Sequence, residues 1–265
     1  LHWTVATKQP AMTASRIAAG LSVKEGRNID IDSMAELVNK VFRTQFIAVL
    51  GNLATVLPTA WAIAWGYRWT TGKHLVAPEK AMHLLHDIDP LHSLALFYAA
   101  IAGVCLFVAG LISGYYDNKA LYTRMAQRVS QLRWLGTLLG TERRARFAVY
   151  VENNLGGLMG NFFFGILLGT MGTLGYGLGL PLDIRHVTFS AANFSTAMVA
   201  LDYRASWELV ALSVAGFLAI GTVNLVVSFG LALWVALRAR NIHFDQGIQL
   251  LNSLGRRFVA APIQF

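Results

Sequence analysis

Charged residues are scarce in this sequence. Asp, Glu, Lys and Arg together make up 14% of its 265 residues, whereas soluble domains contain about 25%. Hydrophobic residues make up 55%. This balance argues against an ordinary water-soluble fold and predicts a membrane protein.

Cysteine is almost absent, and the common catalytic motifs are missing. The single cysteine, Cys105, excludes a disulfide within the chain. The sequence has no G-x-S-x-G, H-E-x-x-H or G-x-x-x-x-G-K-[ST] motif, so the hydrolytic and nucleotide chemistry that these motifs support is not expected. We therefore predict no catalytic residue, no metal and no cofactor in this chain.

Four long stretches contain almost no charged side chain. A bilayer core of about 30 Å requires about 20 apolar helical residues, and four stretches meet this length, with His92 as their one basic residue: 44–66, 91–116, 155–182 and 209–237. The sequence therefore predicts an all-α, polytopic integral membrane protein with four transmembrane helices.

The distribution of Lys and Arg predicts the orientation of these helices. The intervals 1–43, 117–154 and 238–265 contain 17 of these residues, whereas 67–90 and 183–204 contain five. Basic residues accumulate on the cytoplasmic side of a membrane. Both termini and the 117–154 loop are therefore predicted to be cytoplasmic.

These observations predict the organisation of the whole chain. Its predicted parts are a cytoplasmic juxtamembrane segment (1–43), a first transmembrane hairpin (44–116) with a periplasmic loop (67–90), a basic amphipathic cytoplasmic loop (117–154), a second transmembrane hairpin (155–237) with a re-entrant segment (183–204), and a cytoplasmic tail (238–265).

The cytoplasmic loop is expected to form two helices. Asp117 and Asn118 can cap the first, Gly140 can end it, and Thr141 can cap the second. The first helix is amphipathic and can lie on the inner leaflet, where anionic headgroups are the nearest partner. The basic patch of this loop comprises Arg143, Arg144 and Arg146.

The third predicted span carries a stripe of small residues. They fall within an arc of roughly 120° on a helix: Gly157, Asn161, Gly165, Gly169, Gly172, Gly175 and Gly179. Glycine permits close helix packing in a bilayer, and Asn161 can hydrogen-bond across such a contact to Asn224 or Ser228 of the fourth span. A stripe that lines a narrow path is the other interpretation.

The segment after this span, GLPLDIRHVTFSAANFST (179–196), is unusually polar for its position. Pro181 is expected to end the helix, and residues 187–200 are too short to cross a bilayer at about 1.5 Å per residue. We expect a short re-entrant or interfacial helix, which either fixes topology or forms a polar site at the end of a cavity. Arg185 and His186 are expected to pair either with Asp183 or with lipid headgroups. The candidate residues are Asp183, Arg185, His186, Ser190, Asn193, Ser195 and the more distant Asn161.

A second polar run occurs in the outer loop. His83, His86, Asp89 and His92 recur at steps of three, which rotate around a helix by about 60° each time, and Pro90 interrupts the run. Hydrated interfacial histidines are therefore favoured over a zinc site.

Four motifs resemble a known family. They are TVATKQPAMTA (4–14), LISGYYDNKALYTR (111–124), ENNLGGLMGNFFFGILLG (152–169) and LGLPLDIRHVTFSAANFS (178–195). Together they resemble the bacterial transmembrane family named site-specific recombinase. The resemblance implies an inner-membrane protein, of which this chain is the membrane-rich C-terminal part. The name implies DNA strand exchange.

The residues for strand exchange are not recognisable in this chain. No histidine has Arg three residues later, and the 14 acidic residues are scattered. Two functions are therefore expected: a membrane scaffold or transport-like module with a polar site near 183–195, or a membrane anchor for a recombination activity that lies outside this chain. The expected partners are the bilayer, anionic headgroups, and a protein partner or second copy; no motif supports nucleic-acid binding.

Overall fold

The computed structural model describes residues 31–239 and residue 256. Much of the predicted 1–43 segment, almost all of the 238–265 tail and the 4–14 motif lie outside these residues.

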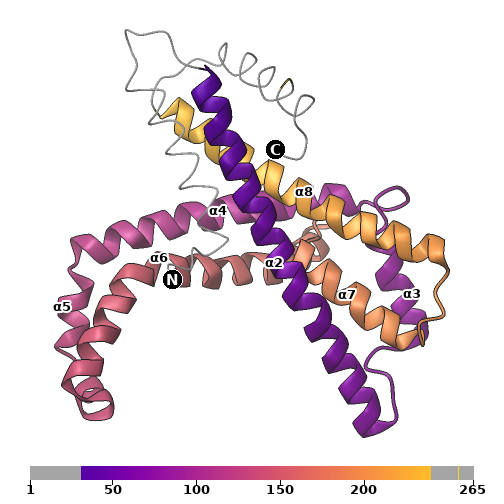
Figure 1. Ribbon diagram of the computed structural model, residues 1–265, viewed down its shortest axis with the longest axis horizontal. Helices are drawn as coiled ribbons and strands as arrows, with labels where there is room; N and C mark the ends of the chain where they lie inside the picture. The colour runs from indigo at the N-terminus through magenta and orange to yellow at the C-terminus, as the bar shows by residue number, and fades with distance from the viewer. Residues whose placement is uncertain (1–30, 240–255, 257–265) are drawn as a thin grey trace.

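The described part of the chain folds into helices, with no strand among them. Four helices are long: α2 (Ile31–Thr71), α4 (Ala95–Tyr122), α6 (Arg133–Leu178) and α8 (Trp207–Arg238). Three shorter helices connect them: α3 (Pro78–His86), α5 (Met125–Ser130) and α7 (Val187–Ala200) (Figure 1). Each long helix contains a stretch that is long and apolar enough to cross a membrane. The predicted all-α chain with four helices of this kind is confirmed.

The directions of the long helices follow from their side-by-side contacts. Gly156 and Gly160 of α6 lie against Ser113 and Ala109 of α4, so these helices are antiparallel. Residues 99 and 103 of α4 meet residues 224 and 227 of α8, so these two are parallel. This alternation is the one that a chain crossing a layer repeatedly would have.

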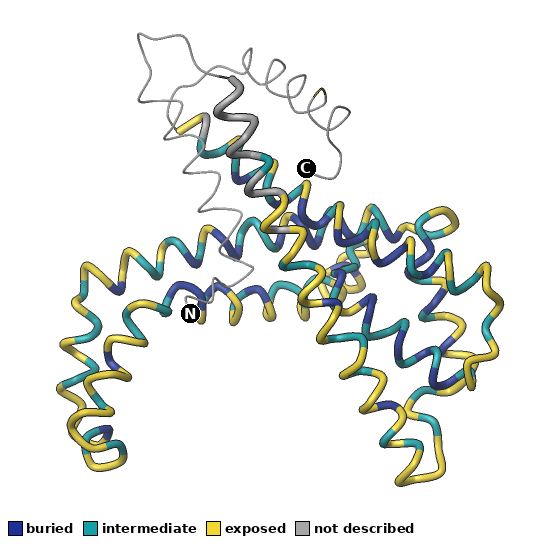
Figure 2. The backbone as a smooth tube through the Cα atoms, in the orientation of Figure 1, coloured by how far each residue is buried: buried dark blue, intermediate teal, exposed yellow. Residues whose placement is uncertain are grey.

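Small side chains form the core where α3, α4, α7 and α8 meet. Its buried residues are Ala81, Leu85, Ile88, Ala95, Ala99, Ala197, Ala200 and Ile220. Because most are alanines, the helix backbones approach closely. The second half of α2 and the region around α5 are exposed over most of their length (Figure 2).

The predicted helix ends are partly right. Gly140 has φ 74° and ψ 168°, which interrupts α6 as expected. Asp117 and Asn118 do not cap a helix, because α4 continues through them to Tyr122 and the chain turns only at Arg124, in the left-handed conformation. Gly179, also left-handed, ends α6 two residues before Pro181.

The close contacts between α6 and α4 involve glycines outside the predicted stripe, whereas Gly175 of the stripe lies against Leu182 of the segment that follows α6. Gly156 and Gly160 face α4, whereas a Cβ at Gly165 or Gly169 would meet no atom within 4 Å. Gly157 is buried, and a Cβ at Gly172 would lie 3.9 Å from Oδ1 of Asp183. Within the described chain, Gly165 and Gly169 therefore do not form the expected contact with the fourth span. The packing surface is rotated toward Gly156 because Ser113 and Asp117 of α4 lie there.

Candidate functional site

The chain between α6 and α7 turns back into the bundle. After Gly179, Ile184 packs against the buried cluster of Cys105, Ala109 and Phe164. The His186 ring lies 5.4 Å from that of Phe164. Helix α7 then leads out again beside α2, as the hydrogen bond between Trp61 and Tyr203 shows. The segment between α6 and α7 therefore packs against the described helices.

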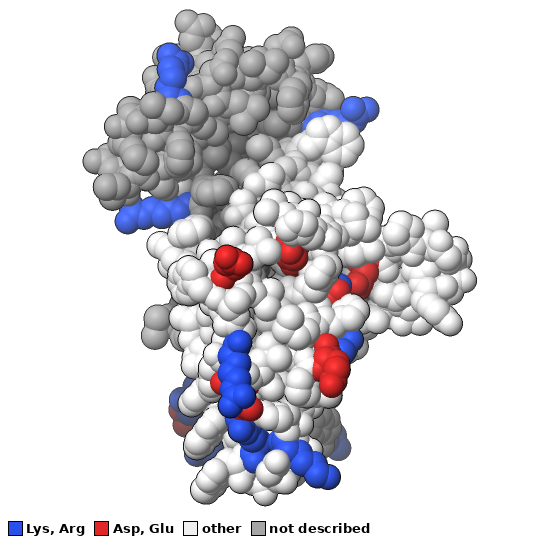
Figure 3. Space-filling view, turned by 90° about the vertical axis from the view of Figure 1, so that its right-hand side faces the viewer, with Lys and Arg blue, Asp and Glu red and all other residues white. Residues whose placement is uncertain are grey.

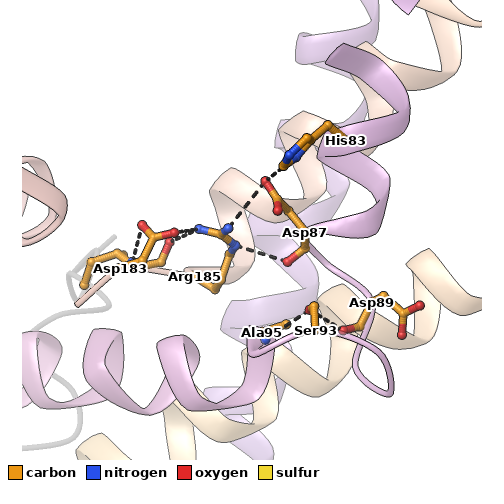
Figure 4. A network of polar contacts seen from close by, with 8 residues as sticks. His83, Asp87, Asp89, Ser93, Ala95, Asp183 and Arg185 are labelled. Atoms are coloured by element: carbon orange, nitrogen blue, oxygen red, sulfur yellow. Dashed lines mark hydrogen bonds and ion pairs between the residues drawn. The ribbon is translucent and has the colours of Figure 1, made fainter. Parts of the chain in front are cut away.

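Arg185 is the centre of a polar network in this segment (Figure 4). Its Nη1 lies 2.5 Å from the Asp183 carboxylate, and its Nη2 lies 3.4 Å from the Asp87 carboxylate. Its Nε donates to the backbone carbonyl of Asp87 at 3.1 Å. The guanidinium also lies 5.6 Å from the centre of the Tyr98 ring. The predicted pairing of Arg185 with Asp183 is therefore confirmed.

The charges of this network are only partly shielded from solvent. The Arg185 side chain is 18% exposed, whereas those of Asp87 and Asp183 are 30% and 45% exposed. Two carboxylates face one guanidinium, and His83 lies 3.4 Å from Asp87. The arrangement fixes the backbone of the segment and leaves its acidic side toward the surface.

Asn224 secures the same segment from α8. It is 3% exposed, and its Nδ2 donates to the carbonyls of Ala99, at 2.7 Å, and Arg185, at 3.1 Å. Its Oδ1 accepts from the N–H of Val187 at 3.1 Å, which satisfies one of the free donors at the start of α7. Asn224 thus links α4, α7 and α8 through hydrogen bonds. Its hydrogen bonds go to these elements and not, as had been expected, to Asn161.

His186 caps α7 in an apolar environment. Its Nδ1 accepts weakly from the Thr188 N–H at 3.4 Å, and its ring lies between those of Phe164 and Phe189. Burial lowers the pKa of His186 to about 4, because an apolar environment disfavours the charged form. The imidazole is therefore neutral at neutral pH.

The remaining candidates are dispersed. Ser190 and Ser195 are buried on α7, and the Ser190 hydroxyl has no hydrogen-bond partner among the residues that the structure describes. Asn193 is half-buried on the same helix, whereas Asn161 lies on the exposed side of α6. None of these four contributes a hydrogen bond to Arg185.

The structure adds Asp87, Tyr98 and Asn224 to the predicted site. Nothing in the spacing of the sequence connects residues 87 and 185, which are 98 positions apart. The available signal was Asn224 itself, because a polar side chain within an apolar span usually has a specific partner.

The histidine run forms pairs with neighbouring carboxylates. His83 approaches Asp87, and the Nδ1 of His92 lies 2.9 Å from Asp89. Burial would raise the pKa of Asp89, but hydrogen bonds from the Leu91 N–H and from His92 lower it overall. The described residues contain no group of three or more His, Cys, Asp or Glu arranged to hold a metal.

The basic patch lies at the opposite end of α4 and α6 from Arg185. Arg143 and Arg146 are exposed and Arg144 is half-buried. Arg146 lies 3.5 Å from Glu142, and both side chains are more than two-thirds exposed. By contrast, the face that carries α3 and the start of α8 shows acidic and basic side chains together (Figure 3).

Comparison with known proteins identifies one family. The family model described as site-specific recombinase matches residues 1–265, the whole chain. No curated protein and no solved structure matches the chain.

Proposed function

The chain belongs to the site-specific recombinase family, and we propose that it acts as a membrane scaffold in which a polar latch holds a re-entrant segment. The latch comprises Asp87, Asp183, Arg185 and Asn224. The scaffold crosses a bacterial inner membrane four times, with both termini and the 117–154 loop in the cytoplasm. Four helices of sufficient length and apolarity support this placement.

The main observation behind the proposal is that the polar groups of Arg185 and Asn224 are bonded to other groups of this chain. All three guanidinium nitrogens of Arg185 contact groups of this chain, and both polar atoms of Asn224 do so as well. A site for a transported solute would be expected to keep polar groups available for that solute. The contacts therefore favour a structural role over a transport site at 183–195.

The test is the stability of an Arg185→Ala variant. Loss of the Arg185 guanidinium would leave the Asp87 and Asp183 carboxylates without their cation. It would also release the segment between α6 and α7 from Asp87, which follows α3. We expect thermal unfolding in detergent to show destabilisation of about 1–3 kcal/mol, with Arg185→Lys intermediate because Lys lacks the planar fork. Limited proteolysis should show faster cleavage between residues 179 and 186.

Arg68→Ala is the matched control. Arg68 pairs with Asp202, and the two side chains are 41% and 39% exposed. Exposed ion pairs contribute only about 0–1 kcal/mol, so this variant should unfold nearly as the parent protein does. An Arg185→Ala variant that unfolds like Arg68→Ala would contradict the latch.

The second candidate function is a membrane anchor for DNA recombination. The family name and the exposed Arg143 and Arg146 favour it. Strand exchange itself would then lie outside this chain. Substituting Arg143, Arg144 and Arg146 by Ala should abolish salt-sensitive retention on duplex DNA; unchanged retention at low salt would count against this function.

A further inference from the structure

The end of the molecule around α5 exposes eight large apolar side chains. We call residues 121–150 the hairpin end; it comprises the last turn of α4, all of α5 and the first part of α6. Its exposed large apolar residues, between 39% and 88% exposed, are Leu121, Tyr122, Leu132, Trp134, Leu138, Phe147, Val149 and Tyr150. A large exposed apolar surface that lies outside the membrane-spanning helices usually marks an interaction site.

We infer that the hairpin end lies flat on the surface of an anionic bilayer, with its apolar side chains in the interface and its arginines at lipid phosphates. This inference rests on the proposed membrane placement and adds a specific lipid contact to it.

The backbone turns the hairpin end sideways. The left-handed Arg124 and the extended Leu132 separate α5 from its neighbours, and Gly140 interrupts α6. Figure 1 shows α5 and the start of α6 directed away from the line of α4. A hydrogen bond of 2.8 Å from the Ala126 N–H to the Glu152 carboxylate fixes α5 on α6. If α4 crosses the bilayer, the hairpin end therefore extends along its surface.

The charge of the hairpin end selects an anionic partner. Residues 121–150 contain six arginines and one acidic residue, Glu142. Glu142 pairs with Arg146, which leaves a large positive excess. Arginine forms paired hydrogen bonds with phosphate oxygens.

The apolar residues favour lipid over DNA. On the helix that follows Gly140, Arg143, Arg146, Phe147 and Tyr150 recur at three- and four-residue spacing, so cations and aromatic rings share one face. Trp and Tyr favour the membrane interface, where an apolar ring and a polar edge are both accommodated. DNA phosphates would pair with the arginines but leave Trp134 and Leu138 in water. Interfacial helices combine these same residue types.

The experiment measures the environment of residue 138. The full chain, with Cys105→Ala and Leu138→Cys, is labelled with an environment-sensitive fluorophore and placed in nanodiscs of phosphatidylcholine, with or without phosphatidylglycerol. With phosphatidylglycerol, the emission should shift to the blue and spin-labelled lipid should quench it. Raising the salt concentration should weaken both effects.

Charge-removal variants test the role of the arginines. Arg143→Gln with Arg146→Gln should lower the equilibrium for the docked state by about tenfold or more, whereas Arg68→Gln with Arg204→Gln, at the other end of the molecule, should leave it unchanged. A label that remains water-exposed in both lipids would overturn the inference, as would shielding by duplex DNA but not by phosphatidylglycerol. Failure of the chain to enter nanodiscs would instead refute the membrane placement itself.

Discussion

His186 is the residue whose surroundings most strongly restrict its protonation. Two phenylalanine rings flank it, and burial lowers its pKa from 6.5 to about 4. The unfolded chain therefore binds a proton between these two pKa values that the folded chain does not, so folding stability contributed by the neutral ring is present above pH 6.5 and is lost as the pH falls toward 4.

This difference predicts a pH-dependent unfolding temperature. Between pH 6.5 and 4, the melting temperature in detergent should fall less for His186→Phe than for the parent protein, because Phe cannot be protonated. His86→Phe, at an exposed position of α3, is the control and should retain the parent profile. Identical pH profiles for His186→Phe and the parent protein would contradict the assignment.

Residue contacts were predictable only where they are local. Asp183 and Arg185 are two positions apart, and their pairing was predicted from the sequence. Asp87, Tyr98 and Asn224 come from other helices, and only the packing of α3, α4 and α8 brings them to Arg185. Spacing along the chain carries no information on such contacts.

At the scale of elements, α6 has two different glycine faces. A Cβ at Gly156 would overlap the Asp117 side chain and the Ser113 carbonyl of α4, whereas a Cβ at Gly165 would meet no atom of the described chain within 4 Å. The first face therefore determines how closely α4 and α6 approach, and the second faces away from the rest of the described chain.

Paired alanine substitutions test this difference. Gly156→Ala should destabilise the protein by about 1–3 kcal/mol through overpacking. Gly165→Ala should be neutral or stabilising by up to about 1 kcal/mol, because Ala favours helix. Thermal unfolding in detergent provides the comparison. Equal destabilisation by both substitutions would contradict the difference between the faces and indicate that another helix packs on Gly165.

Helix positions were predicted better than helix contacts. Hydropathy located the four long helices because each requires a long uncharged stretch, and Gly140 was recognisable as a break. The stripe through Gly165 was recognisable in the sequence. The glycines that contact α4, however, are Gly156 and Gly160, which lie on a different side of α6. Asp117 resembled a cap in sequence, yet it lies inside α4, which continues to Tyr122.

At the scale of the whole molecule, the two predicted outer segments lie together. Arg68 and His74 approach Asp202, and Arg185 contacts Asp87. The arginines of the hairpin end lie at the other end of α4 and α6. Trp61, Trp65 and Trp69 stack along the end of α2, with ring centres 5.9 and 6.3 Å apart, as is typical of a membrane interface.

This separation leads to the central measurement, which is cysteine accessibility in intact cells. In a Cys105→Ala background, His74→Cys should react with a membrane-impermeant maleimide added outside, whereas Arg143→Cys should react only after the cells are permeabilised. That pattern is the result predicted for a chain that crosses the membrane with these segments on opposite sides. Equal labelling of both positions in intact cells would contradict it.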